Sequence, residues 1–209
     1  MTRQRERASL SVDSAILLVH DVVNHFLIPS DRGTGLELSS MLSNIKLLLM
    51  AARRAAVPVV FIAPGRGDPM VEEKSDANAP GRLIWGSSAA DVPADLGPLA
   101  GDEVIRKPRY GAFYRSELDA YMRAADRDTV IVCGVSLAGG VETTIRDAFN
   151  RDFKSVLVSD ACLCRPISDQ GWGVVSQAEV AKVILSILAQ RFAKVLTTEA
   201  VCKKLGGGA

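Results

Sequence analysis

Short apolar runs rich in β-branched residues alternate with longer amphipathic segments along this chain. Such alternation is typical of a parallel β-sheet with helices packed on both faces. The pattern predicts six strands, at residues 15–20, 58–63, 103–106, 129–134, 155–159 and 194–197. Helical spacing of apolar residues predicts crossover helices at residues 37–55, 116–124, 141–150 and 174–192. The expected fold is therefore a three-layer α/β/α arrangement around a six-stranded parallel sheet.

Two stretches between these elements lack a regular period. Residues 64–102 are rich in Gly, Pro, Ser and Asp, and residues 164–173 form a shorter irregular segment. Loops of this length in a compact domain are usually functional lids or disordered excursions. No repeat or linker-like composition divides the chain, so we expect a single domain at residues 12–204 between flexible ends at residues 1–11 and 205–209.

Composition and charge favour a globular protein that acts on a small-molecule substrate. The formal net charge is +1, whereas binding of nucleic acid or anionic lipid needs clustered Lys and Arg. We therefore expect neither nucleic acid nor membrane as a partner. The basic N-terminus lacks the apolar core of a signal peptide, and the four cysteines show no disulfide or metal-site spacing, which favours a cytoplasmic location. With only two histidines, His20 and His25, we expect no metal and no other cofactor.

Candidate chemistry lies where the predicted strands end, because open parallel sheets bind ligands beyond the carboxyl ends of their strands. Asp21 follows the first predicted strand and Lys107 follows the third. Asp21 can equally be an N-cap or a solvated loop carboxylate, and Lys107 can be a solvated surface lysine. If the two side chains sit at neighbouring strand ends and pair, Lys107 keeps Asp21 ionised or tunes it as a proton carrier.

The segment after the fourth predicted strand consists of small residues and leads into a helix. Backbone N–H groups at such a helix start can hold an anionic ligand or an oxyanion. The alternative is that Gly139 and Gly140 only ease a tight turn. The residues alone leave both readings open.

Together these segments resemble the isochorismatase-like, or cysteine-hydrolase, superfamily. Lys107 begins a match to K-x-R-Y-x-A-F, and residues 134–148 match GV-x(4)-C-V-x-[ST]-T-x-x-DA except at the cysteine. Further matches lie at residues 158–161 and 195–198, so the resemblance spans residues 12–200. It implies a Rossmann-like sheet, a catalytic Asp21 with Lys107 as its basic partner, and a non-proline cis peptide near Val135–Ser136.

The resemblance does not supply a nucleophile. In the family a Cys activated by Asp and Lys forms a covalent acyl intermediate, and that position falls on Gly140, which has no attacking group. Cys133 is expected inside a buried strand, where a thiol behaves as a small hydrophobe. Cys162 and Cys164 are expected to follow the fifth strand and are better placed, yet we expect neither to replace the missing nucleophile.

True isochorismatases resemble this chain in having Gly at the cysteine position. They cleave a vinyl ether: the Asp donates a proton to the enol-ether carbon, water captures the resulting cation, and pyruvate is released. Val19, His20 and Asp21 resemble the V-H-D of those enzymes. Residues 83–86 resemble their F-W-G segment, which implies that Trp85 lines the pocket, although a buried structural Trp is the alternative.

Two departures argue against isochorismate itself as the substrate. Those enzymes usually have Gln two positions after the Asp and another Gln after the second strand, whereas this chain has Val23 and, after its second strand, residues 63–65 without Gln. Arg66, Arg82 or Arg109 can supply a carboxylate contact, but each is also a candidate for an ordinary solvated arginine.

Three functional hypotheses remain. The first is a cysteine-independent hydrolase of a small carboxylated metabolite, as in secondary metabolism, with Asp21 protonating a vinyl-ether-like bond. The second is an amide, ureido or imine hydrolase with Asp21-activated water, and the third is a ligand-binding pseudoenzyme. Glu142 is expected to be structural, and residues 174–192 to form a core helix or part of a homodimer or larger homo-oligomer. Substrate contacts are expected from Val135, Ser136, Gly139, His25, Phe26, Trp85, Arg109 and Tyr110.

Overall fold

The computed structural model describes residues 10–27, 35–64 and 88–206. Its strands are β1 (Ala15–His20), β2 (Val59–Pro64), β3 (Glu103–Lys107), β4 (Thr129–Val135), β5 (Lys154–Leu163) and β6 (Lys194–Leu196). Its helices are α1 (Gly35–Arg54), α2 (Leu118–Ala124), α3 (Glu142–Phe149), α4 (Gln177–Arg191) and α5 (Thr198–Leu205). Shorter turns are η1 (Val12–Ser14), η2 (Asn24–Leu27), η4 (Ser88–Ala90) and the π-helical turn η5 (Leu137–Val141). Within these ranges no helix is long and apolar enough to cross a membrane.

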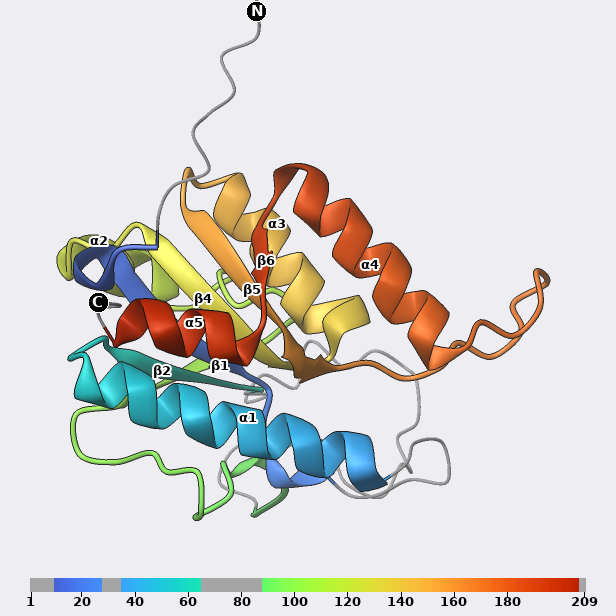
Figure 1. The fold of residues 1–209 in the computed structure, drawn as a ribbon, viewed down its shortest axis with the longest axis horizontal. Helices are drawn as coiled ribbons and strands as arrows, with labels where there is room; N and C mark the ends of the chain where they lie inside the picture. Colours follow the sequence, from blue (N-terminus) through green and yellow to red (C-terminus); the bar gives the residue numbers. More distant parts are fainter. Residues whose placement is uncertain (1–9, 28–34, 65–87, 207–209) are drawn as a thin grey trace, which may run out of the picture.

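The strands form one parallel sheet in the order β3-β2-β1-β4-β5-β6 (Figure 1). Every residue of the central strands β1 and β4 is buried, which explains why their sequences are apolar apart from Thr129 and His20. The predicted six-stranded parallel α/β fold is confirmed.

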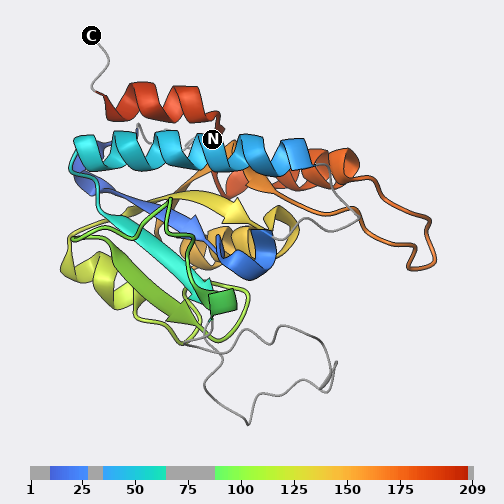
Figure 2. The same ribbon diagram turned by 90° about the horizontal axis from the view of Figure 1, so that it is seen from below.

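Helices cover both faces of the sheet, as Figure 2 shows. One apolar cluster joins α1 and α5 to alternate residues of the strands, including Leu17 and Val19 of β1. The other joins α2, α3 and α4 to the intervening residues, including Ile16 and Leu18. Successive side chains of a strand point to opposite faces, so β1, β2, β4 and β5 each contribute buried residues to both clusters, whereas β3 contributes only Ile105, to the second.

Some predicted boundaries are wrong. β5 continues to Leu163, beyond the predicted end at residue 159, because Asp160 interrupts the apolar run without ending the strand. α4 begins at Gln177, since Ser176 forms a capping box with Glu179. Helix α5 was not predicted; Thr197 caps its start, and its last residue, Leu205, is buried.

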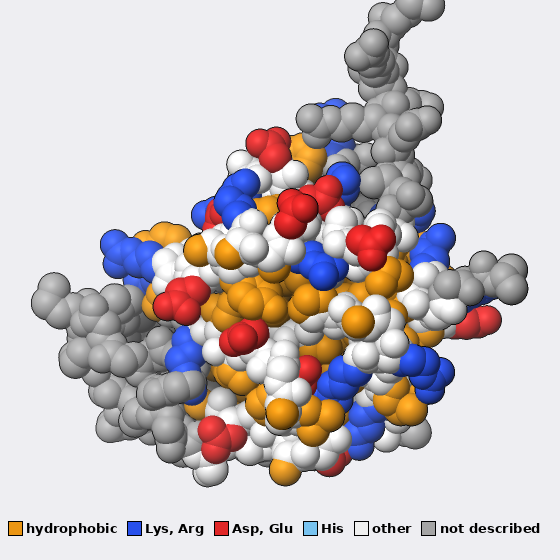
Figure 3. Space-filling view, turned by 90° about the vertical axis from the view of Figure 1, so that its left-hand side faces the viewer, with side chains coloured by type: hydrophobic (Ala, Val, Ile, Leu, Met, Phe, Trp, Pro, Cys, Tyr) orange, Lys and Arg blue, Asp and Glu red, His pale blue; other side chains and the backbone are white. Residues whose placement is uncertain are grey.

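The segment between β5 and α4 projects from the body of the molecule (Figure 1). Ile167 and Val175 form an isolated antiparallel bridge at its base, and Trp172 is almost fully exposed. This segment overlaps the irregular stretch predicted at residues 164–173. Within the described part of the face in Figure 3, acidic and basic side chains are interspersed and do not gather by sign.

Strand order reverses between β1 and β4, which are direct neighbours. The chain leaves β1 for β2 on one side, and later places β4 and β5 on the other. In parallel sheets this arrangement opens a crevice beyond the carboxyl ends of the two strands. The residues after β1 and β4 therefore lie where a ligand site is expected.

Candidate active site

A buried ion pair lies at this edge of the sheet. Lys107 Nζ is 2.8 Å from Asp21 Oδ2, and the two side chains are only 4% and 10% exposed. The residues alone left this pairing open and the resemblance implied it; the contact is present although the two strands are not neighbours, because β2 lies between β1 and β3. Lys107 also donates a hydrogen bond to the carbonyl of Arg109 over 2.9 Å. The ammonium is thus held by one carboxylate oxygen and one backbone oxygen.

The two oxygens of Asp21 have different surroundings. Oδ2 faces Lys107, whereas Oδ1 is buried and has no hydrogen-bond partner among the described residues. The backbone of Asp21 has φ of +50°, in the left-handed region, and its N–H donates to the carbonyl of Ile62 over 2.8 Å. A buried carboxylate oxygen without a partner is costly in a folded protein, which is typical of a group kept for chemistry.

His20 lies between the ends of three strands. Side chains of a strand alternate between the two faces of the sheet, so His20 points to the same face as Ile16 and Leu18, the face covered by α3. Nδ1 is 3.0 Å from the carbonyl oxygen of Val135 and 3.4 Å from Asp21 Oδ2, and Nε2 is 3.2 Å from the carbonyl oxygen of Tyr110. Burial lowers the pKa of His20, the Asp21 carboxylate opposes this, and Lys107 adds to it. Burial thus favours the neutral form of the ring.

The imidazole of His20 fills the space beside Gly140. A Cβ built on Gly140 would stand 3.0 Å from both Nδ1 and Nε2 and closer still to Cε1. Gly140 does not have a positive φ, so its backbone conformation would accept another residue, and the three atoms nearest to the built Cβ all belong to the ring. At the position where the resemblance expects a nucleophile, the structure has a histidine ring from β1.

The turn after β4 begins with a cis peptide bond between Val135 and Ser136, as the resemblance implied. The turn η5 follows, and within it Gly139 has φ of 177° and ψ of −111°. Val141 closes the turn by donating its N–H to the carbonyl of Ser136 over 3.1 Å. Both ends of the turn are packed, since Leu137 and Val141 are buried, whereas Ala138 in its middle is exposed.

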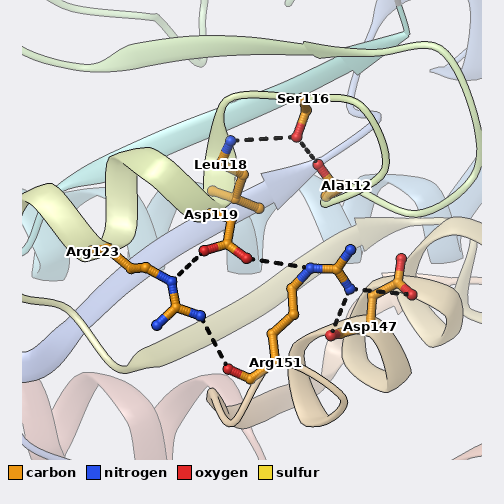
Figure 4. Close-up of polar contacts among 7 residues, drawn as sticks. All are labelled: Ala112, Ser116, Leu118, Asp119, Arg123, Asp147 and Arg151. Carbon is orange, nitrogen blue, oxygen red and sulfur yellow. Dashed lines mark hydrogen bonds and ion pairs between the residues drawn. The ribbon is translucent and has the colours of Figure 1, made fainter.

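Hydrogen bonds and ion pairs fix the segment that follows Lys107. The N–H of Ala112 donates to Thr144 Oγ1 of α3 over 2.9 Å, and the hydroxyl of Ser116 donates to the carbonyl of Ala112. Figure 4 shows that Arg151 then joins Asp119 of α2 to Asp147 of α3. The two motifs of the resemblance are thus joined through side-chain contacts.

Comparison with known proteins agrees with this geometry. The isochorismatase domain model matches residues 15–200. The chain belongs to the isochorismatase family.

Relatives of this isochorismatase-family hydrolase include enzymes with different substrates. It is 33% identical over 202 residues to phenazine biosynthesis protein PhzD1 of Pseudomonas aeruginosa, covering 93% of this chain and 88% of that protein. It is 29% identical over 184 residues to the ureidoacrylate amidohydrolase RutB of Methylobacterium radiotolerans, covering 75% of this chain and 69% of that protein. A crystal structure of a cysteine hydrolase from Pseudomonas syringae matches the whole of both chains with a TM-score of 0.83 and 28% identity.

The cysteines of this family member are poorly suited to act as thiolates. Burial raises the pKa of Cys133 far above its usual range and that of Cys162 to about 12. Cys162 was expected after β5, but it lies inside the strand, where it pairs with Gly134 of β4. Cys164 is buried, its Sγ lies 3.6 Å from the carbonyl oxygen of Gln177, and burial raises its pKa as well. Since the thiolate is the nucleophilic form, these shifts disfavour thiol catalysis.

The remaining predicted site residues have different surroundings. Tyr110 is 70% exposed, and its ring lies beside Gly139, 3.7 Å from a Cβ built there. Arg109 is exposed, and only its carbonyl contacts Lys107. His25 is half-buried and meets Phe26 edge to face at 5.2 Å, while Phe26 packs against the apolar cluster under α1.

Other predictions concern residues with a local partner or no description. Glu142 pairs with Arg146 one helical turn away, over 3.1 Å, which fits the expected structural role. Trp85, Arg66 and Arg82 lie outside the described residues. Among the residues that are described, no group of three His, Cys, Asp or Glu side chains could hold a metal ion.

The packing of His20 against Gly140 is the feature that the sequence did not predict. His20 was noted for its place in V-H-D, without a function. The available signal was the combination of a large residue before Asp21 with a glycine at the nucleophile position. Neither position alone shows that the two are in contact.

Proposed function

We propose that this isochorismatase-family hydrolase cleaves a vinyl-ether-like bond in a small carboxylated metabolite, with Asp21 as the proton donor and without a covalent thiol intermediate. The observation that carries the proposal is the asymmetry of Asp21. Oδ2 is engaged by Lys107, while the buried Oδ1 has no partner among the described residues. A carboxyl oxygen in this state can exchange a proton with a substrate.

The proposed reaction adds one water molecule. The reaction starts from the neutral carboxyl form of Asp21, whose Oδ1–H transfers its proton to the terminal carbon of the enol ether, while the electron pair of the carbon–carbon double bond forms the new C–H bond. Water adds to the resulting oxocarbenium carbon and returns one proton to the Asp21 carboxylate. The hemiketal then breaks its C–O bond to give an alcohol and a ketone. Lys107 stabilises the carboxylate that exists between the two proton transfers.

The similarity to a ureidoacrylate amidohydrolase favours a second candidate, hydrolysis of an amide, ureido or imine bond. In that reaction Asp21 Oδ1 accepts a proton from water, which attacks the carbonyl or imine carbon directly. The buried thiols and the glycine at position 140 support a direct attack over a thioester route for this class too. The two candidates therefore share Asp21 but differ in the atom that receives or loses the proton.

Turnover in D₂O distinguishes the two candidates. A panel of enol-ether acids and of amides and ureido acids is assayed, and the products are analysed by mass spectrometry. Carbon protonation places one deuterium on the product carbon that ended the double bond, and hydrolysis of an amide places none there. We expect Asp21→Asn to lower kcat by about 10²–10⁴-fold, as for loss of a general acid or base. Asp95 provides the matched control, since Asp95→Asn removes the same charge from a different, exposed ion pair.

Thiol variants complete the test. Cys162→Ala and Cys164→Ala are expected to keep their activity. The proposal is refuted if Asp21→Asn retains turnover. It is also refuted if a bound ligand is recovered unchanged while every member of the panel resists hydrolysis.

A further inference from the structure

His20 and Gly140 share one space in the folded chain. The three atoms nearest to a Cβ built on Gly140 all belong to the imidazole of His20. Real Cβ atoms do not approach other carbons this closely, because van der Waals contact between carbons lies at about 3.5–4.0 Å. The imidazole therefore enforces a glycine at position 140, and any side chain there must displace it.

The same ring connects the catalytic loops. Nδ1 faces the carbonyl of Val135 at the cis peptide, and Nε2 faces the carbonyl of Tyr110 in the loop after β3. Asp21 Oδ2 lies on the Nδ1 side, at 3.4 Å. The ring is thus placed to orient Asp21 and to fix the two loops on either side of it.

A neutral imidazole has one N–H, so the position of its proton decides which contact it makes as a donor. A proton on Nδ1 lies toward two acceptors, the carbonyl of Val135 and the carboxylate of Asp21. A proton on Nε2 meets only the carbonyl of Tyr110. Hydrogen bonds to a charged acceptor are the stronger ones, which favours the Nδ1–H tautomer.

We propose that His20 is a positioning residue whose ring fills the space that a nucleophilic side chain at position 140 would occupy. Its Nδ1–H orients Asp21 so that Oδ1 faces the substrate. The orienting function rests on the proposed function of Asp21. The exclusion of a side chain at position 140 does not. The two parts can therefore be tested separately.

The exclusion is tested without any substrate. Gly140→Cys should lower the melting temperature by about 2–12 °C, the range expected from overpacking in a domain of this size. His20→Asn removes the outer part of the ring, so the double variant His20→Asn with Gly140→Cys should melt above the Gly140→Cys variant. Ala138→Cys, on an exposed residue of the same turn, is the matched control and should melt with the wild type. The claim that His20 excludes a side chain at position 140 is overturned if Gly140→Cys melts at the wild-type temperature, or if the double variant melts no higher than Gly140→Cys.

The orienting function is tested with two variants of opposite geometry. Asn carries its amide nitrogen one bond from Cγ, as Nδ1 is in His, whereas Gln carries it one atom further, toward the position of Nε2. We expect His20→Gln and His20→Ala to lower kcat by up to about 10²-fold with little change in KM, as for a misplaced catalytic group. His20→Asn should recover most of this loss. Equal losses of kcat in all three variants, or a loss confined to KM, overturns the orienting function.

Failure of the proposed function gives a different result. In that case the chosen substrates are not turned over by the wild type, while the melting temperatures still report on the shared space. Any substrate class that depends on Asp21 then serves for the kinetic comparison of the His20 variants.

Discussion

Removal of Lys107 should destabilise the protein strongly, although a salt bridge in itself is weak evidence of stability. The two charges lie 2.8 Å apart, and their side chains are 4% and 10% exposed. At an effective dielectric constant of about 20 their attraction is about 6 kcal/mol, offset by a desolvation penalty of several kcal/mol for each ion. The net contribution of the intact pair is small, but a single buried charge retains its penalty without the attraction.

We therefore expect Lys107→Met to lower the free energy of unfolding by about 3–5 kcal/mol, the typical result of breaking a buried pair. Asp21→Asn should fall at the lower end of this range, because its amide oxygen can still accept a hydrogen bond from Nζ. The double variant should lose less than the sum of the two single losses, by about 2 kcal/mol, because no uncompensated charge remains.

Urea unfolding followed by circular dichroism measures these differences. The control is Lys46, whose pair with Asp95 lies at 2.5 Å with side chains 47% and 65% exposed. Lys46→Met should change the free energy of unfolding by no more than about 1 kcal/mol, because solvent screens exposed pairs. The reasoning is refuted if Lys107→Met is as mild as Lys46→Met, or if the losses at Lys107 and Asp21 simply add.

Two further predictions concern His20 and Asp160. Burial lowers the pKa of His20 in the folded state, so the unfolded chain binds more protons than the folded chain below about pH 6.5. The free energy of unfolding of the wild type should therefore fall as the pH falls from about 7.5 to about 5.5, with a slope of up to about 1.4 kcal/mol per pH unit. His20→Asn, with Asp21 and Lys107 intact, should reduce that slope in urea titrations, and identical slopes would contradict the burial of a neutral ring. Asp160 accepts hydrogen bonds from the N–H and the hydroxyl of the buried Thr198, both over 2.8 Å, so Asp160→Ala should cost about 1–3 kcal/mol in the same assay. Asp169 is the control: it also accepts two backbone hydrogen bonds, but it lies on an exposed loop where water can replace its carboxylate. Equal losses in the free energy of unfolding for Asp160→Ala and Asp169→Ala would be evidence against a stabilising contribution from the buried Asp160–Thr198 hydrogen bonds.

Much of the fold could be predicted because local pattern and tertiary position agree. The central strands are buried on both faces, so their sequences are predominantly apolar and easily recognised. Helix α5 was missed because it begins right after the three-residue strand β6 and its only buried apolar residues are Val201 and Leu205. The end of β5 was misplaced because Asp160, a polar residue inside the strand, is held there by Thr198, which is distant in the sequence.

The site was predicted in part for a similar reason. The ends of the first and third predicted strands identified Asp21 and Lys107, since ligand sites lie beyond the carboxyl ends of parallel strands. Their contact across β2 depends on strand order, which periodicity does not determine. The packing of His20 against Gly140 joins two positions that are far apart in the chain, so it emerges only from the three-dimensional structure.

The central claim is that hydrolysis depends on Asp21 and on no thiol. Its most direct test is the kcat/KM of a variant with all four cysteines replaced by alanine, compared with Asp21→Asn under the same conditions and corrected for the folded fraction. We predict that the cysteine-free protein retains the kcat/KM of the wild type, while Asp21→Asn loses it. Loss of activity in the folded cysteine-free protein, together with a substrate-derived mass on a cysteine of the wild type during turnover, would contradict the claim.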